Sequence, residues 1–162
     1  MALRASLAGL LAFILALVVE LAVLGLLDID SVWLLAVGIA PPVEELAKRL
    51  AMQWLGAGWA MTGLAFGVIE AGLKLAEWRG PGVAGAIASL LQHWAYGRFA
   101  EQRGLGLAIG LHMGFNLLVL LGDLALGDAG FWLAPVGAAL LLWVSFWEKH
   151  LDRGVDLGRG PP

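Results

Sequence analysis

The sequence contains no cysteine and few charged residues. The absence of cysteine among 162 residues excludes thiol catalysis, disulfide bonds and cysteine-ligated metal. Only 14% of the residues are charged and 60% are hydrophobic, whereas a soluble domain is about a quarter charged and about half apolar. The net charge of −3 provides no basic surface, so no nucleic-acid partner is expected. We therefore expect an integral membrane protein whose surroundings are the lipid bilayer.

The long apolar runs predict an all-α fold, a polytopic bundle of about six transmembrane helices. Each span needs roughly 20 mainly apolar residues to cross the bilayer. The runs that meet this length lie at residues 5–27, 32–55, 58–76, 82–100, 104–122 and 130–147. We expect a single transmembrane helical domain over residues 1–150 and a short flexible cytoplasmic tail over residues 151–162.

The distribution of Lys and Arg predicts that both termini face the cytoplasm. With the amino terminus inside, six cations fall on the cytoplasmic side: Arg4, Arg98, Arg103, Lys149, Arg153 and Arg159. The opposite loops hold mainly acids: Asp28, Asp30, Asp123 and Asp128, with Arg79 as the cation there. The positive-inside rule therefore predicts an N-in/C-in arrangement.

A proline pair interrupts the second span directly before two adjacent glutamates. Prolines are tolerated in the first turn of a helix, where a missing N–H has no intrahelical partner to lose. Pro41 and Pro42 therefore predict a break, with a helix restarting at about Val43. Glu44 and Glu45 would then lie in the first turn, where the positive end of the helix dipole favours carboxylates.

Two cations follow the two glutamates at helical spacing. Glu44 with Lys48 and Glu45 with Arg49 are i,i+4 pairs in the favourable orientation. One interpretation is a self-neutralised ionic turn that carries a helix end across the membrane interface. However, each ionisable group at membrane depth costs roughly 2.5–3.5 kcal/mol and usually marks function or a paired network. Two carboxylates side by side behind a helix break favour a functional interpretation.

Two later spans carry small-x-x-x-small faces, which permit close helix approach in lipid. The first face contains Gly63 and Gly67 and also carries Glu70, which should therefore point toward neighbouring helices. Lys74 follows Glu70 by four residues, so simple neutralisation of Glu70 is the alternative. The second face lies in the fifth span and is formed by Gly106, Gly110 and Gly114.

The two mid-span histidines have different surroundings in the sequence. His93 lies on one helical stripe with Ser89, which favours proton handling, although a satisfied interhelical hydrogen bond is the alternative. His112 and Asn116 are i,i+4 and share a face. A titratable nitrogen beside an amide donor suits polarisation of a carbonyl and stabilisation of an oxyanion. Alternatively, Asn116 merely orients His112.

Taken together, spans two to five each supply an intramembrane polar group, whereas spans one and six supply almost none. This segregation predicts a polar-cored bundle of spans two to five, with spans one and six as packing. Glu20, the carboxylate of span one, is expected to be snorkelled, protonated or paired. Ser and Thr are few, so the available Glu and His side chains favour water activation, directly or through a metal.

The order of these motifs resembles the PrsW family of intramembrane proteases, which is related to the wider CAAX protease and bacteriocin-processing clan. Glu44-Glu45-x-x-Lys48 is similar to the first PrsW motif, and Glu44-Glu45-x-x-x-Arg49 also satisfies the clan's Glu-Glu-x-x-x-Arg form. The resemblance covers about residues 36–120. It implies that Glu44 activates the attacking water as general base and that Glu45 supports it through Lys48 or Arg49.

The later motifs extend the resemblance, with one departure. His112-x-x-x-Asn116 is similar to the clan's last motif. The clan's second motif is usually Phe-x-x-x-His, but here Phe66 is followed by Glu70, as in PrsW-like sequences, which makes His93 the substitute partner of Glu44. The resemblance implies that His112 and Asn116 form the oxyanion site, and that Glu70 and His93 complete a proton relay.

The resemblance implies hydrolysis of a peptide bond in a membrane-anchored protein or peptide substrate, near or inside the bilayer. We expect the protein in the inner (cell) membrane of a prokaryote. A glutamate mechanism uses no metal or other cofactor. A zinc mechanism would use His93, His112 and Glu44, because three N/O ligands plus water form a normal catalytic zinc set. The sequence has no His-Glu-x-x-His helix, which favours the metal-free version.

Two alternatives to an enzyme use the same residues. A small proton- or ion-coupled transporter would employ Glu and His side chains on facing spans as a proton relay. Broken helices such as the span with Pro41 and Pro42 are common in transporters, although the other half of this chain has no second broken helix to match. A non-catalytic membrane scaffold of the same fold is the other alternative.

Overall fold

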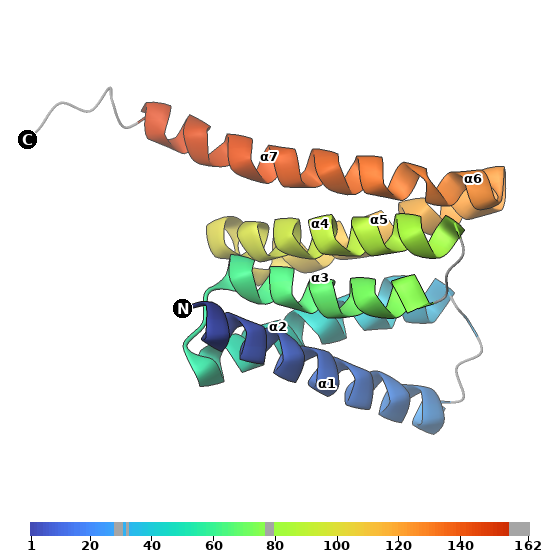
Figure 1. Ribbon diagram of the computed structural model, residues 1–162, viewed down its shortest axis with the longest axis horizontal. Coiled ribbons are helices and arrows are strands. Elements are labelled where there is room, and N and C mark those ends of the chain that lie inside the picture. Colours follow the sequence, from blue (N-terminus) through green and yellow to red (C-terminus); the bar gives the residue numbers. More distant parts are fainter. Residues whose placement is uncertain (28–30, 32, 77–79, 156–162) are drawn as a thin grey trace, which may run out of the picture.

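The computed structural model describes residues 1–27, 31, 33–76 and 80–155, which form helices and short turns. In chain order the elements are α1 (Ala2–Leu27), η1 (Leu34–Ile39), α2 (Ala40–Leu55), α3 (Trp59–Ala76), α4 (Gly80–Arg103), α5 (Leu105–Leu126), α6 (Asp128–Phe131) and α7 (Leu133–Val155). The long helices lie side by side along roughly one direction (Figure 1). No strand occurs in these described ranges, so the predicted all-α class is confirmed.

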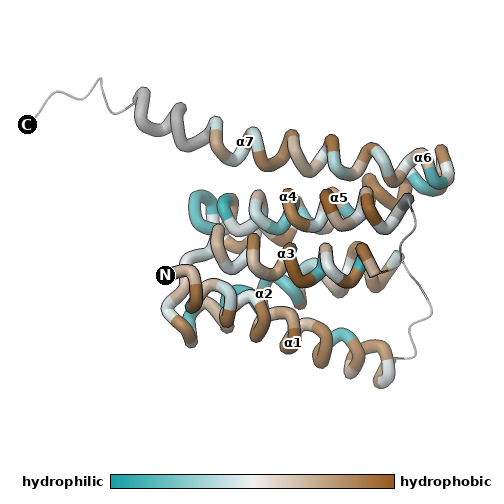
Figure 2. Tube along the Cα trace, viewed as in Figure 1, coloured by the Kyte–Doolittle hydropathy of each residue, from teal (hydrophilic) through white to brown (hydrophobic). Residues whose placement is uncertain are grey.

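Several of these helices have the character of membrane spans. Four helical stretches are long and apolar enough to cross a membrane: Ala2–Leu27, Trp59–Ala76, Leu105–Leu126 and Asp128–Trp147. The second and fourth predicted spans form helices but lie outside this set. The α2 helix has only 16 residues and contains Glu44, Glu45, Lys48 and Arg49, and α4 ends in a hydrophilic segment (Figure 2). The fold is therefore compatible with a membrane protein.

The carboxyl-terminal boundary differs from the prediction. The predicted domain end at residue 150 falls inside α7, which continues to Val155. Residues 151–155 are helical because no glycine or proline follows Gly137 in this helix before Gly154. The rest of the predicted tail lies outside the described residues. Several residues used to predict the orientation also lie outside them: Asp28, Asp30, Arg79 and Arg159.

The central helix α4 packs against α3, α5, α6 and α7. Its contact with α3 is close because glycines face backbone across the interface. A Cβ on Gly67 of α3 would lie 2.7 Å from the Ser89 carbonyl oxygen, and a Cβ on Gly97 of α4 would lie 2.6 Å from the Trp59 carbonyl oxygen. Neither position has room for a side chain. The predicted close approach at the Gly63 and Gly67 face is therefore confirmed.

The glycine face of α5 behaves differently. A Cβ on Gly106, Gly110 or Gly114 would have no neighbouring described atom within 4 Å, so the predicted close helix approach is wrong at this face. Instead, an apolar cavity of about 580 Å³ lies between α5 and α7 beside Gly110 and Gly114. The α7 helix is joined to α4 by polar contacts. Arg98 Nε donates to Ser145 Oγ over 3.0 Å, and Arg98 Nη2 donates to the Ser145 carbonyl over 3.1 Å.

The second predicted span is broken, as expected, but the break is a π-helix that leads into α2. Its first part, η1, is a π-helix in which the Ala40 N–H donates to the Leu35 carbonyl, five residues back. The next donor in this register would be residue 41, which would bond the Ala36 carbonyl. Pro41 has no N–H, so the chain leaves the Ala36 carbonyl oxygen without its helical partner.

The restart of the helix comes earlier than predicted. The α2 helix begins at Ala40 rather than Val43, with the prolines among its first residues. Its first turn contains no acidic residue, so the prediction that Glu44 and Glu45 lie there is wrong. The π-helix leads directly into α2 without an intervening loop, and this moves the helix start toward the amino terminus. The two glutamates therefore lie in the second turn.

Candidate active site

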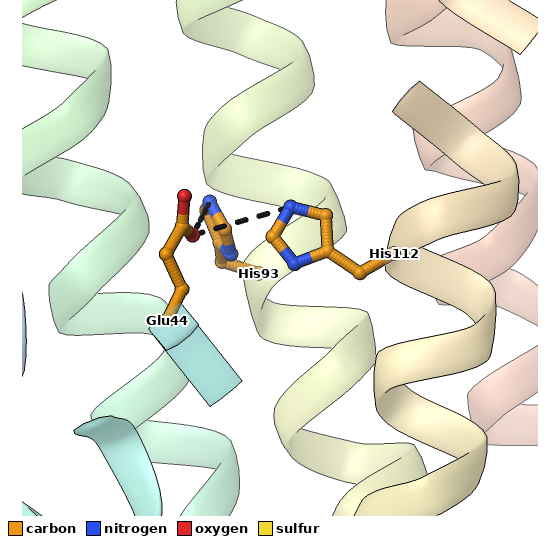
Figure 3. A group of neighbouring side chains, drawn as sticks. All are labelled: Glu44, His93 and His112. Atoms are coloured by element: carbon orange, nitrogen blue, oxygen red, sulfur yellow. Dashed lines mark ion pairs between the residues drawn. The ribbon is translucent and has the colours of Figure 1, made fainter. Parts of the chain in front are cut away.

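Three ionisable side chains from three helices meet inside the bundle (Figure 3). They are Glu44 of α2, His93 of α4 and His112 of α5. The Glu44 Oε2 atom lies 3.7 Å from His93 Nε2 and 4.0 Å from His112 Nε2. Both histidines are buried. Residues that are separated by up to 68 positions in the sequence, and were predicted to act together, thus lie together in the structure.

A buried ion pair supports this group from one side. Lys48 Nζ lies 2.7 Å from Glu45 Oε1 and 3.7 Å from Glu44 Oε2. The same ammonium group lies 4.0 Å from the centre of the Phe66 ring, a cation–π contact. Arg49 is exposed, and no ion pair joins it to any residue in the described part of the chain. The predicted Glu45–Arg49 pair is therefore wrong, because Glu45 points inward to Lys48 while Arg49 points outward.

The contacts of His93 determine which ring nitrogen carries hydrogen. His93 Nδ1 lies 2.8 Å from Lys48 Nζ, and an ammonium group can only donate. The Nδ1 atom therefore accepts, and the ring hydrogen is on Nε2. That N–H donates to Glu70 Oε2 over 2.5 Å. Both ring nitrogens are thus engaged, and the orientation of the ring is fixed from both sides.

His112 has one engaged and one open nitrogen. Its Nδ1 lies 3.1 Å from Glu45 Oε1. Because the Glu45 carboxylate is paired with Lys48, it accepts, and Nδ1 carries the hydrogen. The unprotonated Nε2 then faces Glu44. The Tyr96 ring stacks on the His112 ring with centroids 4.6 Å apart, which further restricts the imidazole.

Glu70 has two partners rather than one. Lys74 Nζ lies 2.7 Å from Glu70 Oε1, so the predicted neutralisation by Lys74 is present. The other carboxylate oxygen accepts the His93 Nε2 hydrogen. Lys74 is itself held by donating to Ser89 Oγ over 2.7 Å. Glu70 therefore orients His93 in the second layer around Glu44.

Asn116 ties the broken helix to α5. Its Nδ2 donates over 2.7 Å to the Ala36 carbonyl, the oxygen that Pro41 leaves without a helical partner. An amide nitrogen carries two hydrogens, so one hydrogen remains for another acceptor. Asn116 and His112 share a face of α5, as predicted. Both side chains line a cavity of about 320 Å³ together with Glu44 and Glu70.

Two of the residues that line this cavity have a carboxylate oxygen without a hydrogen-bond partner among the described residues. In the described part of the chain, Glu44 Oε2 and Glu20 Oε1 are enclosed and accept no hydrogen bond. Glu20 comes from α1 and lines the cavity beside Glu44 and Glu70. The prediction that span one serves only as packing is therefore wrong. Span six also contributes a buried polar group, Ser145, although at a distance from this cavity.

Three side chains around the cluster were not predicted as site residues: Glu20, Gln92 and Tyr96. Gln92 lines the same cavity and Tyr96 stacks on His112. A signal for Gln92 and Tyr96 was present, because both flank His93 on a helix that faces the bundle. Glu20 is a lone carboxylate in an apolar run, which at membrane depth is itself a functional signal.

The donor set does not fit a three-ligand zinc site. One ligand atom each of Glu44, His93 and His112 lies within 4.8 Å of the others. Zinc needs ligands at about 2.0–2.2 Å, with an unprotonated nitrogen from each histidine. His93 accepts from Lys48 through Nδ1 and donates to Glu70 through Nε2, so neither nitrogen is free to bind a metal. Two of the three ligands, Glu44 and His112, remain available.

The cavity therefore combines three chemical capacities. It has a carboxylate oxygen without a hydrogen-bond partner (Glu44), an imidazole lone pair (His112) and a spare amide hydrogen (Asn116). No protein-family model matches the chain, and comparisons with curated proteins and with solved structures find no match either. The function must therefore be inferred from this geometry.

Proposed function

We propose that this chain is a membrane-embedded endopeptidase that hydrolyses a peptide bond of a membrane-anchored substrate by a metal-free glutamate mechanism. One observation carries the proposal. The Glu44 Oε2 atom has no hydrogen-bond partner in the described part of the chain and faces the open His112 Nε2 at 4.0 Å. Both residues line one cavity inside a bundle of mainly apolar helices. A base and an acceptor at this separation suit activation of one water molecule between them.

The proposed steps follow from the hydrogen positions. A water molecule bridges Glu44 Oε2 and His112 Nε2, and Glu44 takes one of its hydrogens as the oxygen attacks the carbonyl carbon. The spare Asn116 N–H donates to the resulting oxyanion. Glu44 then passes its hydrogen to the departing nitrogen, so the products are a carboxylic acid and an amine. His112 orients the water in this scheme, because its Nε2 accepts and does not donate.

Glu45 is the less suitable base of the two adjacent glutamates. It is fully buried, its Oε1 accepts from Lys48 and His112, and its Oε2, unpartnered within the described ranges, belongs to a side chain that does not line the cavity. A carboxylate held in this way is stabilised in its charged form and orients its partners instead of reacting. We therefore assign Glu45, Lys48 and Glu70 the role of positioning the two imidazoles. His93 links Lys48 to Glu70.

The membrane arrangement belongs to the same proposal. We infer six spans with both termini in the cytoplasm of a prokaryotic cell, in its inner membrane, and membership of the PrsW-type proteases. In support, α1 begins and α7 ends at the same end of the bundle (Figure 1). The α2 and α4 helices would cross with Glu44, Lys48 and His93 turned toward one another inside the bundle, which is how membrane proteins accommodate such groups.

Replacement of Glu44 by Gln tests the proposal. Glu44→Gln keeps the size of the side chain but removes the base, so cleavage of a transmembrane reporter should fall by roughly 10²–10⁴-fold. Glu101→Gln, at an exposed carboxylate on α4, is the matched control and should cleave like the wild type. The measurement is the rate of reporter cleavage by purified protein in detergent or liposomes. Unchanged cleavage by the Glu44→Gln variant would end the proposal.

The two alternative functions predict different results in the same preparation. A proton-coupled transporter would show flux in vesicles that depends on Glu70 or His93, without cleavage of the reporter. A non-catalytic scaffold would keep its activity after simultaneous replacement of Glu44, Glu45 and His112. Within the described ranges η1 is the one π-helical segment, so the structure supplies no second π-helical break to pair with the first.

A further inference from the structure

Gln92 is buried without a partner. Only 4% of its surface is exposed. Within the described part of the chain, its Oε1 is enclosed and accepts no hydrogen bond, and no contact of its amide group with another described polar group is found. Two of its neighbours on α4, Ser89 and His93, are satisfied, since Ser89 accepts from Lys74 and His93 bonds Glu70. A buried polar group left unsatisfied costs about 1–3 kcal/mol, so this amide is placed for a partner that binds to the protein.

Gln92 lies where two cavities adjoin. One is the cavity of about 320 Å³ that contains Glu44, His112 and Asn116. The other has about 270 Å³ and lies between α4, α5, α6 and the start of α7. Both cavities are lined by Gln92 and Asn116. Lys74 and Val119 line both cavities as well, so a chain that extends from the reacting centre into the second cavity would pass beside these two amides.

The second cavity is suited to a bulky uncharged side chain. Apart from the two amides, its walls are mainly small or apolar, including Ala88, Phe131 and Ala134. Lys74 also lines it, but its ammonium group is already paired with Glu70 and donates to Ser89. A cavity of about 150 Å³ is sufficient to hold benzene. A volume of about 270 Å³ therefore has room for a large aliphatic or an aromatic side chain.

We propose that Gln92 binds the main chain of the substrate beside the scissile bond, and that the adjoining cavity is the subsite for a bulky uncharged residue. This inference rests on the proposed peptidase function and adds its substrate class. A carboxamide has one acceptor and two donors, as a peptide unit has one donor and one acceptor. An extended peptide inside the bilayer must satisfy each N–H and C=O with protein groups. The unpartnered Gln92 amide meets that requirement at the cavity junction.

The first test separates binding from folding. In the Gln92→Leu variant the unpartnered amide is replaced by an apolar group of similar size. We expect kcat/KM for the transmembrane reporter to fall about 10–100-fold, mainly through KM, as expected for loss of two hydrogen bonds. The unfolding midpoint should be unchanged or higher. Gln102→Leu on the same helix is the matched control: its Oε1 is also unpartnered in the part of the chain that the structure describes, but its Nε2 donates to the Ser145 carbonyl over 3.1 Å and the side chain lines neither cavity.

The control should give the opposite result. Gln102→Leu should lower the unfolding midpoint and leave kcat/KM unchanged. Equal kcat/KM in the wild type and Gln92→Leu would overturn the inference. A loss of activity in Gln92→Leu that only follows a loss of folded protein would overturn it as well.

The second test addresses the subsite itself. Reporters carry Ala, Leu or Phe at each of the positions flanking the scissile bond. The Ala134→Leu variant fills the cavity and should favour the Ala reporter, whereas Phe131→Ala enlarges it and should favour the Phe reporter. We expect the ratio of kcat/KM for Phe over Ala to move in opposite directions, by about tenfold in each variant.

The outcomes distinguish this inference from the proposed function. If the wild type cleaves, Glu44→Gln does not, and neither cavity variant changes residue preference at any position, the subsite is wrong and the peptidase proposal stands. If the wild type cleaves no reporter, both fail.

Discussion

The two adjacent glutamates of α2 face different sides of the site. Glu45 is fully buried, lies 2.7 Å from Lys48 and accepts from His112. Glu44 has no hydrogen bond on Oε2 in the described residues, and the Lys48 ammonium lies 3.7 Å away. Consecutive residues of an α-helix point about 100° apart, so one carboxylate enters the packed core while its neighbour faces the cavity. Identical chemistry thus receives two roles from helix geometry.

The comparison separates an anchored side of the site from an open side. On the anchored side, ion pairs join Glu45 to Lys48 and Glu70 to Lys74, and through them both imidazoles are oriented. On the open side, Glu20, Glu44 and Gln92 each have an oxygen that is unpartnered among the described residues and line the cavities, and Asn116 has a spare hydrogen. Charge on the anchored side supports structure, whereas polar groups on the open side are left free to meet a substrate.

The largest effect on stability should come from the anchored side. Glu45→Gln removes the charge that faces Lys48 and leaves a buried cation poorly compensated. Breaking a buried pair in this way costs about 3–5 kcal/mol. The free energy of unfolding in detergent, measured with denaturant, checks this value. Glu44→Gln is the matched control and should change the unfolding free energy by less than about 1 kcal/mol. Equal losses in the two variants would remove the distinction between the sides.

A smaller effect is expected where α3 packs on α4, behind His93. In Gly67→Ala the added Cβ would lie 2.7 Å from the Ser89 carbonyl oxygen and 3.1 Å from the His93 Cβ. The helices must separate, at a cost of about 1–3 kcal/mol, and reporter cleavage should fall with the shift of His93. The measurements are unfolding free energy and cleavage rate.

The control for Gly67→Ala lies on the open glycine face of α5. Gly110→Ala meets no described atom within 4 Å and replaces glycine by a better helix former. It should leave stability unchanged or raise it by up to about 1 kcal/mol. If Gly110→Ala destabilises as much as Gly67→Ala, the two faces do not differ as the structure indicates.

The smallest effect, no change in the rate of reporter cleavage, is expected when metal is removed. His93 has no free ring nitrogen, so treatment with a chelator should not change the rate of reporter cleavage. The check is a cleavage assay before and after chelation, with elemental analysis of the same preparation. Loss of activity that returns on addition of zinc would show that the Lys48–His93–Glu70 chain rearranges to free a ligand.

Much of the fold followed from local sequence pattern. The apolar runs predicted all six long helical segments, because each is a continuous stretch whose length and hydropathy are local properties. The start of α2 was misplaced because a π-helix precedes it, and the carbonyl that this helix leaves open at Ala36 accepts from Asn116, 80 residues away. Local rules contain no information about such a distant partner. The end of α7 differed for another reason, because no glycine or proline follows Gly137 before Gly154 to mark where the helix stops.

The sequence predicted which residues form the site better than it predicted their contacts. Glu44, His93 and His112 were expected together and lie together. The partner of Glu45 was wrong, because spacing alone allows both i+3 and i+4 partners and only tertiary burial selects Lys48 over Arg49. The open glycine face of α5 was missed for the same reason. A small-residue face permits close packing, but whether a helix fills it depends on where the polar ties, here Arg98 to Ser145, hold α7.

The wide turn of η1 determines the direction in which the glutamates that follow it point around the helix axis. A π turn contains about one residue more than an α turn, so everything after Ile39 is rotated by roughly 100° relative to a regular helix of the same sequence. None of the side chains from Leu34 to Ile39 is ionisable, yet this segment sets the angular phase of Glu44. Deleting one residue there would restore the regular phase and aim Glu44 away from both imidazoles. The spacing of an apolar segment is therefore as much a part of the site as its acids.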